Sequence, residues 1–517
     1  MDHGTSDVAP AHNDEPSHET RGGPWFSAET PPLSYAQYLF GGDTGLTEEE
    51  VADAAAKVDT WRVLPARARP KLAHLLIDMV DRATAHEDCE KNSGCDCLAC
   101  QQRLDAWREI DYVFQITARN VERAEPLDPV KTGPKVDEII SSRVIRAQKH
   151  GWRALVEEYH GDAALRRTED LDQGQPEPIK RTVGEPASQR DADAFCRNAK
   201  TMQLSSAASC LTAPAILPDS DRLRQKLKEK IRPIDAEAEK AEALMRLRHR
   251  RLKEMQDQIT PEMIHALDQA LAQRASKLKP SKKKGRTGWR NEFIKQLHET
   301  RAGPALRRLA IQFLIGKAPL EVYKRYGYVS LGPRDKGQGP EDPRPVGSPE
   351  PFWRWAVGAA VKDFEASSKK LLLPHQFAIG VSCGAEKMGK RTSFDAAQLP
   401  GHQWLIPDVF NAYNELDREE AVNDMCEVHP LAGTMTIALY TVPTVYAHDT
   451  RGADSPKYVT VTGVIQGCNA GMHAFTISQR KPVEWISETA EAAGRGLSEL
   501  PVFQHESPAA VKENEIC

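Results

Sequence analysis

The carboxylate of Asp408 stands at a position that suits a functional site. It directly follows the short apolar run 404–407 and begins the polar stretch DVFNAYNELDREE. An apolar run of about four to eight residues that ends in polar, turn-prone residues is typical of a buried strand. We therefore expect the strand to deliver this acid to a site at the edge of a sheet.

A second group of reactive side chains is the cysteine cluster HEDCEKNSGCDCLAC, which holds Cys89, Cys95, Cys97 and Cys100 just after His86. Four thiolates can hold a tetrahedral zinc ion, and a site with four protein ligands is structural because no position stays open. The spacing matches a zinc site only in part, since Cys97 and Cys100 form one CxxC pair whereas five residues separate Cys89 from Cys95. A loop of free cysteines is the alternative.

A third candidate is the basic run RASKLKPSKKKGRTGWR, which has eight basic residues and no acid between Arg274 and Arg290. Such a run can contact nucleic-acid phosphates or act as a nuclear import signal. A solvated linker explains the same composition, so all three interpretations stay open.

Two segments resemble catalytic motifs of reverse transcriptases. In the first motif of that family a strand ends in an aspartate and an aromatic residue follows five positions later, as Tyr413 follows Asp408. In the next motif a strand, a Gln-Gly pair and a helix follow one another. The segment GVIQGCNAGMHAF at 463–475, which contains Gln466 and Gly467, is similar to it in order and spacing.

Three upstream segments extend the resemblance. The segment LLLPHQFAIGVSCGAEKM at 371–388 resembles the sequence that precedes the first motif, and PRDKGQGPEDPRPVGSPEPFWRW at 333–355 resembles the fingers hairpin. The segment GRTGWRNEFIKQL at 285–297 is similar to the start of the domain in non-LTR-type retroelements. The matches occur in family order and cover about residues 285–480, so the resemblance implies a fingers and palm polymerase domain.

The resemblance also implies roles for individual residues. Asp408, together with the backbone carbonyl of Val409, would bind magnesium for two-metal phosphoryl transfer. The ring of Tyr413 would exclude a ribose 2′-hydroxyl and so favour deoxynucleotides. The other expected nucleotide-binding residues are Lys336 and Arg344 on the phosphates, Gln466 near the nucleotide, and Gly467 beside the template–primer. The implied partners are an RNA or DNA template–primer and deoxynucleotides.

The sequence also departs from the family. The family's aromatic-x-Asp-Asp motif is missing, because Asp454 is the last aspartate. In addition, Pro407 removes a hydrogen-bond donor just before Asp408, the usual Asp-Pro after Gln-Gly is replaced by Cys468-Asn469, and Ala378 stands where glycine is common. With one carboxylate the magnesium site is incomplete, so we expect weak or absent polymerase activity.

Three interpretations follow. The first is a reverse transcriptase domain of retroelement origin that stops before the aromatic-x-Asp-Asp motif, through loss or through truncation of the gene model. The second is a non-catalytic nucleic-acid-binding protein with a degenerate palm. The third is a helical scaffold in which the matches are accidental. We take the first as the expectation.

The elements that position these residues are of mixed type. The spacing of PKLAHLLIDMVDRA predicts a helix, and alternation in TVYAHDTRGADSPKYVTVTG predicts a hairpin. The charge-rich stretch at 221–276 predicts a long solvated or partner-packed helix, in which no strict heptad holds across Pro233 and Pro261. The predicted fold class is α+β. The expected regions are a disordered acidic tail (1–45), a small helical domain with the cysteine cluster (46–125), an irregular linker (126–220), a charged helical region ending in the basic run (221–284), the fingers/palm region (285–480) and a C-terminal tail (481–517).

Composition sets the remaining limits. The chain of 517 residues has a formal net charge of −5, 40% hydrophobic residues and a mean hydropathy of −0.55, which is polar for a globular protein. No run approaches the roughly eighteen apolar residues of a membrane span, and the first residues lack the pattern of a secretory signal. We therefore expect an intracellular, possibly nuclear, protein without a membrane partner, whose ten cysteines are free or metal-bound.

Overall fold

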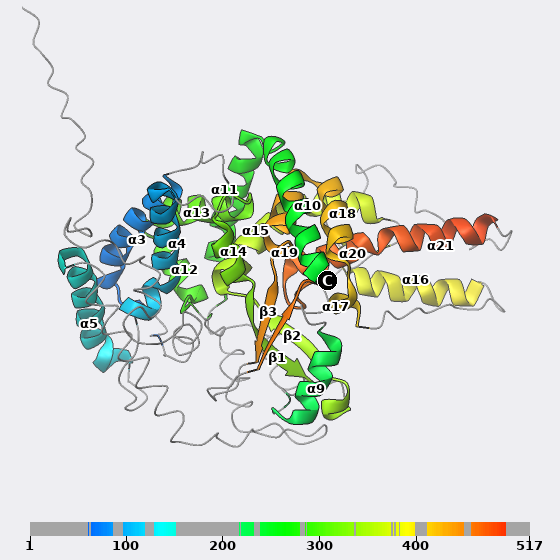
Figure 1. Ribbon diagram of the computed structural model, residues 1–517, viewed down its shortest axis with the longest axis horizontal. Helices are drawn as coiled ribbons and strands as arrows, with labels where there is room; N and C mark the ends of the chain where they lie inside the picture. The colour runs from blue at the N-terminus through cyan, green and yellow to red at the C-terminus, as the bar shows by residue number, and fades with distance from the viewer. Residues whose placement is uncertain are drawn as a thin grey trace, which may run out of the picture.

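The computed structural model describes residues 60, 64–85, 97–118, 129–150, 217, 219–231, 238–279, 285, 287–335, 338–373, 376, 379–381, 383–398, 411–448 and 456–492. Helices dominate this part of the chain and surround one small sheet, so the fold is α+β, as predicted (Figure 1). None of the described helices is long and apolar enough to cross a membrane.

The N-terminal helices are α3 (Ala68–Thr84), α4 (Leu98–Thr117) and α5 (Pro129–His150). The predicted helix in PKLAHLLIDMVDRA is confirmed as α3, which buries residues at three and four spacing such as Leu72, Leu76, Met79 and Val80. Helix α5 differs from expectation, because it lies in the stretch expected to be irregular. Its buried positions 136, 140, 144 and 147 have the helical period, which the surrounding polar residues obscure.

The charge-rich stretch forms three helices: α9 (Asp221–Lys230), α10 (Ala238–Asp257) and α11 (Pro261–Ser276). Helix α9 begins after Ser220, whose side chain accepts a hydrogen bond from the Leu223 amide, and α11 begins after Thr260 in the same manner. The expected long helix is therefore divided. Pro261 is the first residue of α11, a position where its missing amide donor costs no intrahelical hydrogen bond.

The remaining helices build the C-terminal unit. They are α12 (Asn291–His298), α13 (Gly303–Leu314), α14 (Leu320–Tyr326), the 3₁₀ turn η2 (Gly339–Glu341), α15 (Pro351–Leu372), α16 (Gly384–Gln398), α17 (Ala412–Glu415), α18 (Arg418–Val428), α19 (Pro430–Tyr440), α20 (Asn469–Ser478) and α21 (Arg480–Ala492). Helix α19 is buried along its whole length from Leu431. Helices α16 and α21 extend away from the rest on the right of Figure 1.

The sheet contains β1 (Tyr328–Arg334), β2 (Arg344–Ser348), β3 (Thr444–His448) and β4 (Lys457–Thr460) in the order β2-β1-β3-β4. Strands β1 and β2 form an antiparallel hairpin, β3 runs parallel to β1, and β4 returns antiparallel to β3. The predicted hairpin at 444–462 is therefore confirmed. Tyr446 lies opposite Tyr458, and Thr444 lies opposite Thr460.

One hydrophobic core joins the N-terminal helices to the C-terminal unit. The Trp289 indole donates to the carbonyl of Ile110 in α4 at 3.1 Å, and its ring packs edge-on against Phe114 with centroids 4.7 Å apart. The buried Asp111 accepts from the Tyr326 hydroxyl at 2.9 Å and pairs with Arg325 at 3.0 Å. These contacts fix helix α4 against the elements that lead into the sheet.

Candidate functional site

The structure describes only some of the residues expected to bind the nucleotide. Arg344, Tyr413, Gln466 and Gly467 are described. Lys336, Asp408 and Val409 lie outside the described residues, as do Pro407, Ala378, Cys89 and Cys95. The site is therefore built from the first four side chains and their neighbours.

The segment after Asp408 lies directly against the turn that precedes Gln466. The amide of Val464 donates to the carbonyl of Tyr413 at 2.7 Å, and the amide of Gly463 donates to the carbonyl of Leu416 at 2.8 Å. Gly463 has a φ of +73°, and a Cβ there would lie 2.5 Å from Cα of Asn414. A close backbone approach of this kind requires glycine, so these two sequence motifs share one packed interface.

The ring of Tyr413 has a fixed orientation. It stacks on Phe475 of α20 with centroids 5.0 Å apart and 27° between the planes. The side chain is half-buried, and burial raises the pKa of its hydroxyl. Asn411, which precedes α17 in a left-handed conformation with a φ of +49°, accepts a hydrogen bond from Asn414 and so fixes the start of the helix. The position of Tyr413 is therefore fixed by the start of α17 and by the stacking contact with Phe475.

The Gln466-Gly467 turn contacts β2, the second strand of the β1–β2 hairpin. The amide of Gly347 in β2 donates to the carbonyl of Gln466 at 3.0 Å. Gly467 has a φ of +113°, and a Cβ at this position would lie 2.5 Å from the Gly347 carbonyl oxygen. Gly467 itself is exposed, and the Gln466 side chain is partly exposed. Both residues therefore face a surface that a ligand can reach.

The hairpin carries two arginines at the end nearest its turn. Arg344 is exposed and lies opposite Arg334 in the register of β1 and β2. Burial lowers the pKa of Arg334, since a desolvated guanidinium favours its charged form less. The strand register therefore places two basic residues opposite each other at the turn end of the hairpin.

Sequence reasoning missed Arg418, which is 2% exposed at the start of α18. Its guanidinium donates to the carbonyl of Gly463 at 2.6 Å, to the carbonyl of Val442 at 2.9 Å and to Thr444 Oγ1 at 2.8 Å. It thereby ties the start of β3 to the turn that leads to Gln466. The polar sequence LDREE gives no signal of this burial, because such a stretch is typical of an exposed helix start.

The carboxylates nearest to Asp408 in the sequence have structural roles. Glu415 accepts a hydrogen bond from Asn411 at 3.0 Å. Asp417 is the N-cap of α18 and accepts from the amides of Glu419 and Glu420. Within the described ranges no group of three His, Cys, Asp or Glu side chains is arranged to hold a metal ion. The expected magnesium ligands Asp408 and Val409 lie outside these ranges, so magnesium binding stays a prediction.

The expected zinc site is described only at its second pair. Cys97 is exposed and precedes α4, and Cys100 lies in the first turn of that helix. The basic run is also described only at its ends. Arg274 is partly buried against Gly358 of α15, and burial lowers its pKa, so this residue belongs to the packing of α11. Zinc binding at the cluster and phosphate binding at the basic run stay predictions.

No family model matches the chain, and no curated protein matches it either.

Proposed function

We propose that residues 285–480 form a reverse transcriptase-like unit that binds a template–primer and a deoxynucleotide, and that these 517 residues extend a primer weakly or not at all. The observation that carries the proposal is the meeting of three segments that lie far apart in the sequence. The Tyr413 segment hydrogen-bonds the 463–464 turn, and the Gln466 carbonyl hydrogen-bonds the β1–β2 hairpin.

The exposed side chains of these segments suit the proposed ligand. Arg344 is exposed at the end of the hairpin, where its guanidinium can donate hydrogen bonds to a phosphate. Tyr413 offers a ring edge held by Phe475, and such a rigid ring can exclude a 2′-hydroxyl by size. Gln466 offers an amide that can donate to or accept from a nucleotide.

The proposal is tested by binding of a fluorescent DNA primer annealed to an RNA template, measured by anisotropy with the full chain at several salt concentrations. Arg344→Gln should weaken binding by about three- to tenfold and reduce the slope of log affinity against log salt by about one. Arg246→Gln is the matched control, because Arg246 is an exposed arginine that belongs to α10 and pairs with Glu242 of the same helix. Equal effects of the two substitutions would contradict the proposed site.

Catalysis is tested separately by primer extension with magnesium and all four deoxynucleotides, comparing the unmodified chain with Asp408→Ala. We expect little or no extension by either protein. Clear extension that disappears on substitution would mean that other carboxylates complete the metal site, and the activity part of the proposal would be wrong.

A second candidate is a non-catalytic nucleic-acid-binding protein, favoured by the structural use of Glu415 and Asp417. The two functions differ in their response to nucleotide. Under the first proposal, a complementary deoxynucleotide triphosphate tightens template–primer binding more than a non-complementary one does. Under the second, neither nucleotide changes the affinity.

A further inference from the structure

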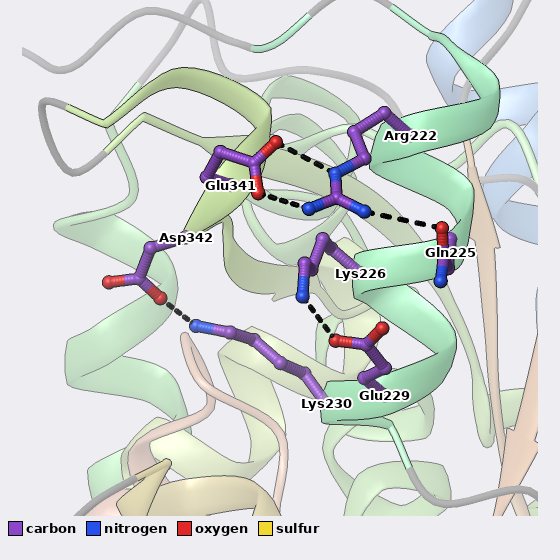
Figure 2. Close-up of polar contacts among 7 residues, drawn as sticks. All are labelled: Arg222, Gln225, Lys226, Glu229, Lys230, Glu341 and Asp342. Carbon is purple, nitrogen blue, oxygen red and sulfur yellow. Dashed lines mark hydrogen bonds and ion pairs between the residues drawn. The ribbon is translucent and has the colours of Figure 1, made fainter.

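Helix α9 lies against the turn that joins β1 to β2 (Figure 2). The Arg222 guanidinium donates to both carboxylate oxygens of Glu341 in η2, with Nε 2.7 Å from Oε1. One residue further along the turn, Asp342 pairs with Lys230 at the end of α9. The apolar residues Leu223 and Leu227 face inward and are fully buried. The turn is therefore held at two points by side chains of one helix.

Lys230 also connects α9 to the Tyr413 segment. Its backbone carbonyl accepts a hydrogen bond from Nδ2 of Asn411 at 2.9 Å, whereas its side chain reaches Asp342. Asn411 directly precedes α17, which contains Tyr413. A single residue of α9 thus bridges the two segments to which the proposed function assigns nucleotide binding.

Helix α9 is rich in basic residues, and ion pairs engage four of its five basic side chains. Its sequence DRLRQKLKEK has five basic and two acidic residues. Arg222 and Lys230 are paired with acids of the turn, and Arg224 is paired with Asp219 just before the helix. Carboxylates on arginine and lysine occupy the positions that phosphate oxygens would take.

The Arg222–Glu341 and Lys230–Asp342 ion pairs differ in solvent exposure, and this difference determines which pair breaks first. The side chains of Arg222 and Glu341 are 47% and 53% exposed, so this pair contributes little to stability and exchanges partners readily. Those of Lys230 and Asp342 are 10% and 29% exposed, so this pair is less screened by water. The exposed pair should therefore open first, and the more buried pair should open only when a stronger anion replaces its carboxylate.

We propose that Arg222, Lys230, Glu341 and Asp342 form a displaceable clasp that holds the β1–β2 turn closed in the free chain. Phosphates of a template–primer displace the two carboxylates, take over Arg222 and Lys230, and release the turn toward the bound nucleic acid. The inference rests on the proposed function, since it assigns the clasp to the same ligand.

The test compares template–primer binding by the full chain and by the double variant Glu341→Gln/Asp342→Asn. Without the two carboxylates, the affinity for template–primer should rise about tenfold. This is the size expected when two such ion pairs no longer compete with the phosphates for Arg222 and Lys230. The matched control is Glu254→Gln/Asp257→Asn, which removes the same charge from exposed ion pairs near the end of α10. Figure 1 places α10 well away from α9. The control should change affinity less than twofold.

Hydrogen exchange of the same proteins without nucleic acid provides the second measurement. The clasp variant should exchange the α9 and 339–342 amides several-fold faster, and template–primer should produce the same acceleration at 339–342 in the unmodified chain. Equal affinity gains in the clasp variant and the control would overturn the clasp, because charge alone would explain them. If no protein binds template–primer, the proposed function fails and the displacement step fails with it.

Discussion

Replacing the buried Arg418 by methionine should destabilise the protein strongly and loosen the candidate site. The substitution keeps much of the apolar volume but removes the donors that satisfy the Gly463 carbonyl, the Val442 carbonyl and Thr444 Oγ1. A buried acceptor left without its donor costs about 1–3 kcal/mol. Because the three share one site, their costs do not add fully. We expect a loss of about 3–5 kcal/mol in the free energy of unfolding.

Arg248→Met is the matched control. Arg248 is also buried and lies over the ring of Tyr323 at 4.9 Å, but its hydrogen bonds to the carbonyls of Ile437 and Ala438 are 3.4 and 3.2 Å long. The Ile437 carbonyl already accepts from the amide of Thr441. Since little is left unsatisfied, we expect a loss of about 1–2 kcal/mol.

Urea unfolding of the full chain measures both losses, and hydrogen exchange locates the first. The Val464 amide, which donates to Tyr413, should exchange much faster in Arg418→Met than in Arg248→Met. The reasoning would be refuted if Arg418→Met lay within about 1 kcal/mol of the unmodified protein, or if Arg248→Met were the more damaging change.

Three further predictions follow from buried or constrained residues. Asp111→Ala should cost about 3–5 kcal/mol in urea unfolding because it leaves the buried guanidinium of Arg325 without a counter-charge, whereas Asp111→Asn should cost less. Burial lowers the pKa of His473 below its ordinary value of about 6.5. The contribution of the neutral imidazole to stability is therefore fully present above that pH and is lost as the pH falls through the folded-state pKa. His473→Gln should accordingly reduce the loss of unfolding free energy between about pH 7.5 and 5. Gly467→Ala should cost about 1–3 kcal/mol because Gly467 has a positive φ and contacts the backbone of β2. Gly389→Ala should stabilise the protein slightly, because Gly389 lies in the exposed helix α16 and a Cβ there meets nothing within 4 Å. Thermal unfolding of the two variants measures both effects.

Local sequence signals predicted the elements that depend on local physics. The alternation in 444–462 predicted the β3–β4 hairpin. Burial alternates along β4, whereas β3 is buried at all five positions. The helical composition of the charged stretch predicted helix there, but the structure divides the expected long helix into α9, α10 and α11. Gly463 and Gly467, which belong to the segment that resembles the second motif, both have a positive φ and lie at close backbone contacts.

Long-range features could not be predicted in this way. The polar surroundings of Arg418 and Arg222 give no sign that one is buried against carbonyl groups and the other is paired with Glu341 more than a hundred positions away. The hydrophobic core that joins α4 to the C-terminal unit could not be predicted from local signals either. Trp289 and Asp111 are separate signals in the sequence, and only the tertiary packing places both at the junction between helix α4 and the C-terminal unit.

The residues that hold the candidate site together differ from those that would do chemistry in it. Arg418, Gly463 and Gly347 fix the backbone of three segments through hydrogen bonds to main-chain groups, and none of them needs a ligand to do so. Clustered catalytic carboxylates have the opposite property, because like charges within a few ångströms repel and lower the stability of the folded state. The hydrogen bonds of the first set carry no such repulsion, so the packing of these three segments does not depend on a cluster of carboxylates beside them.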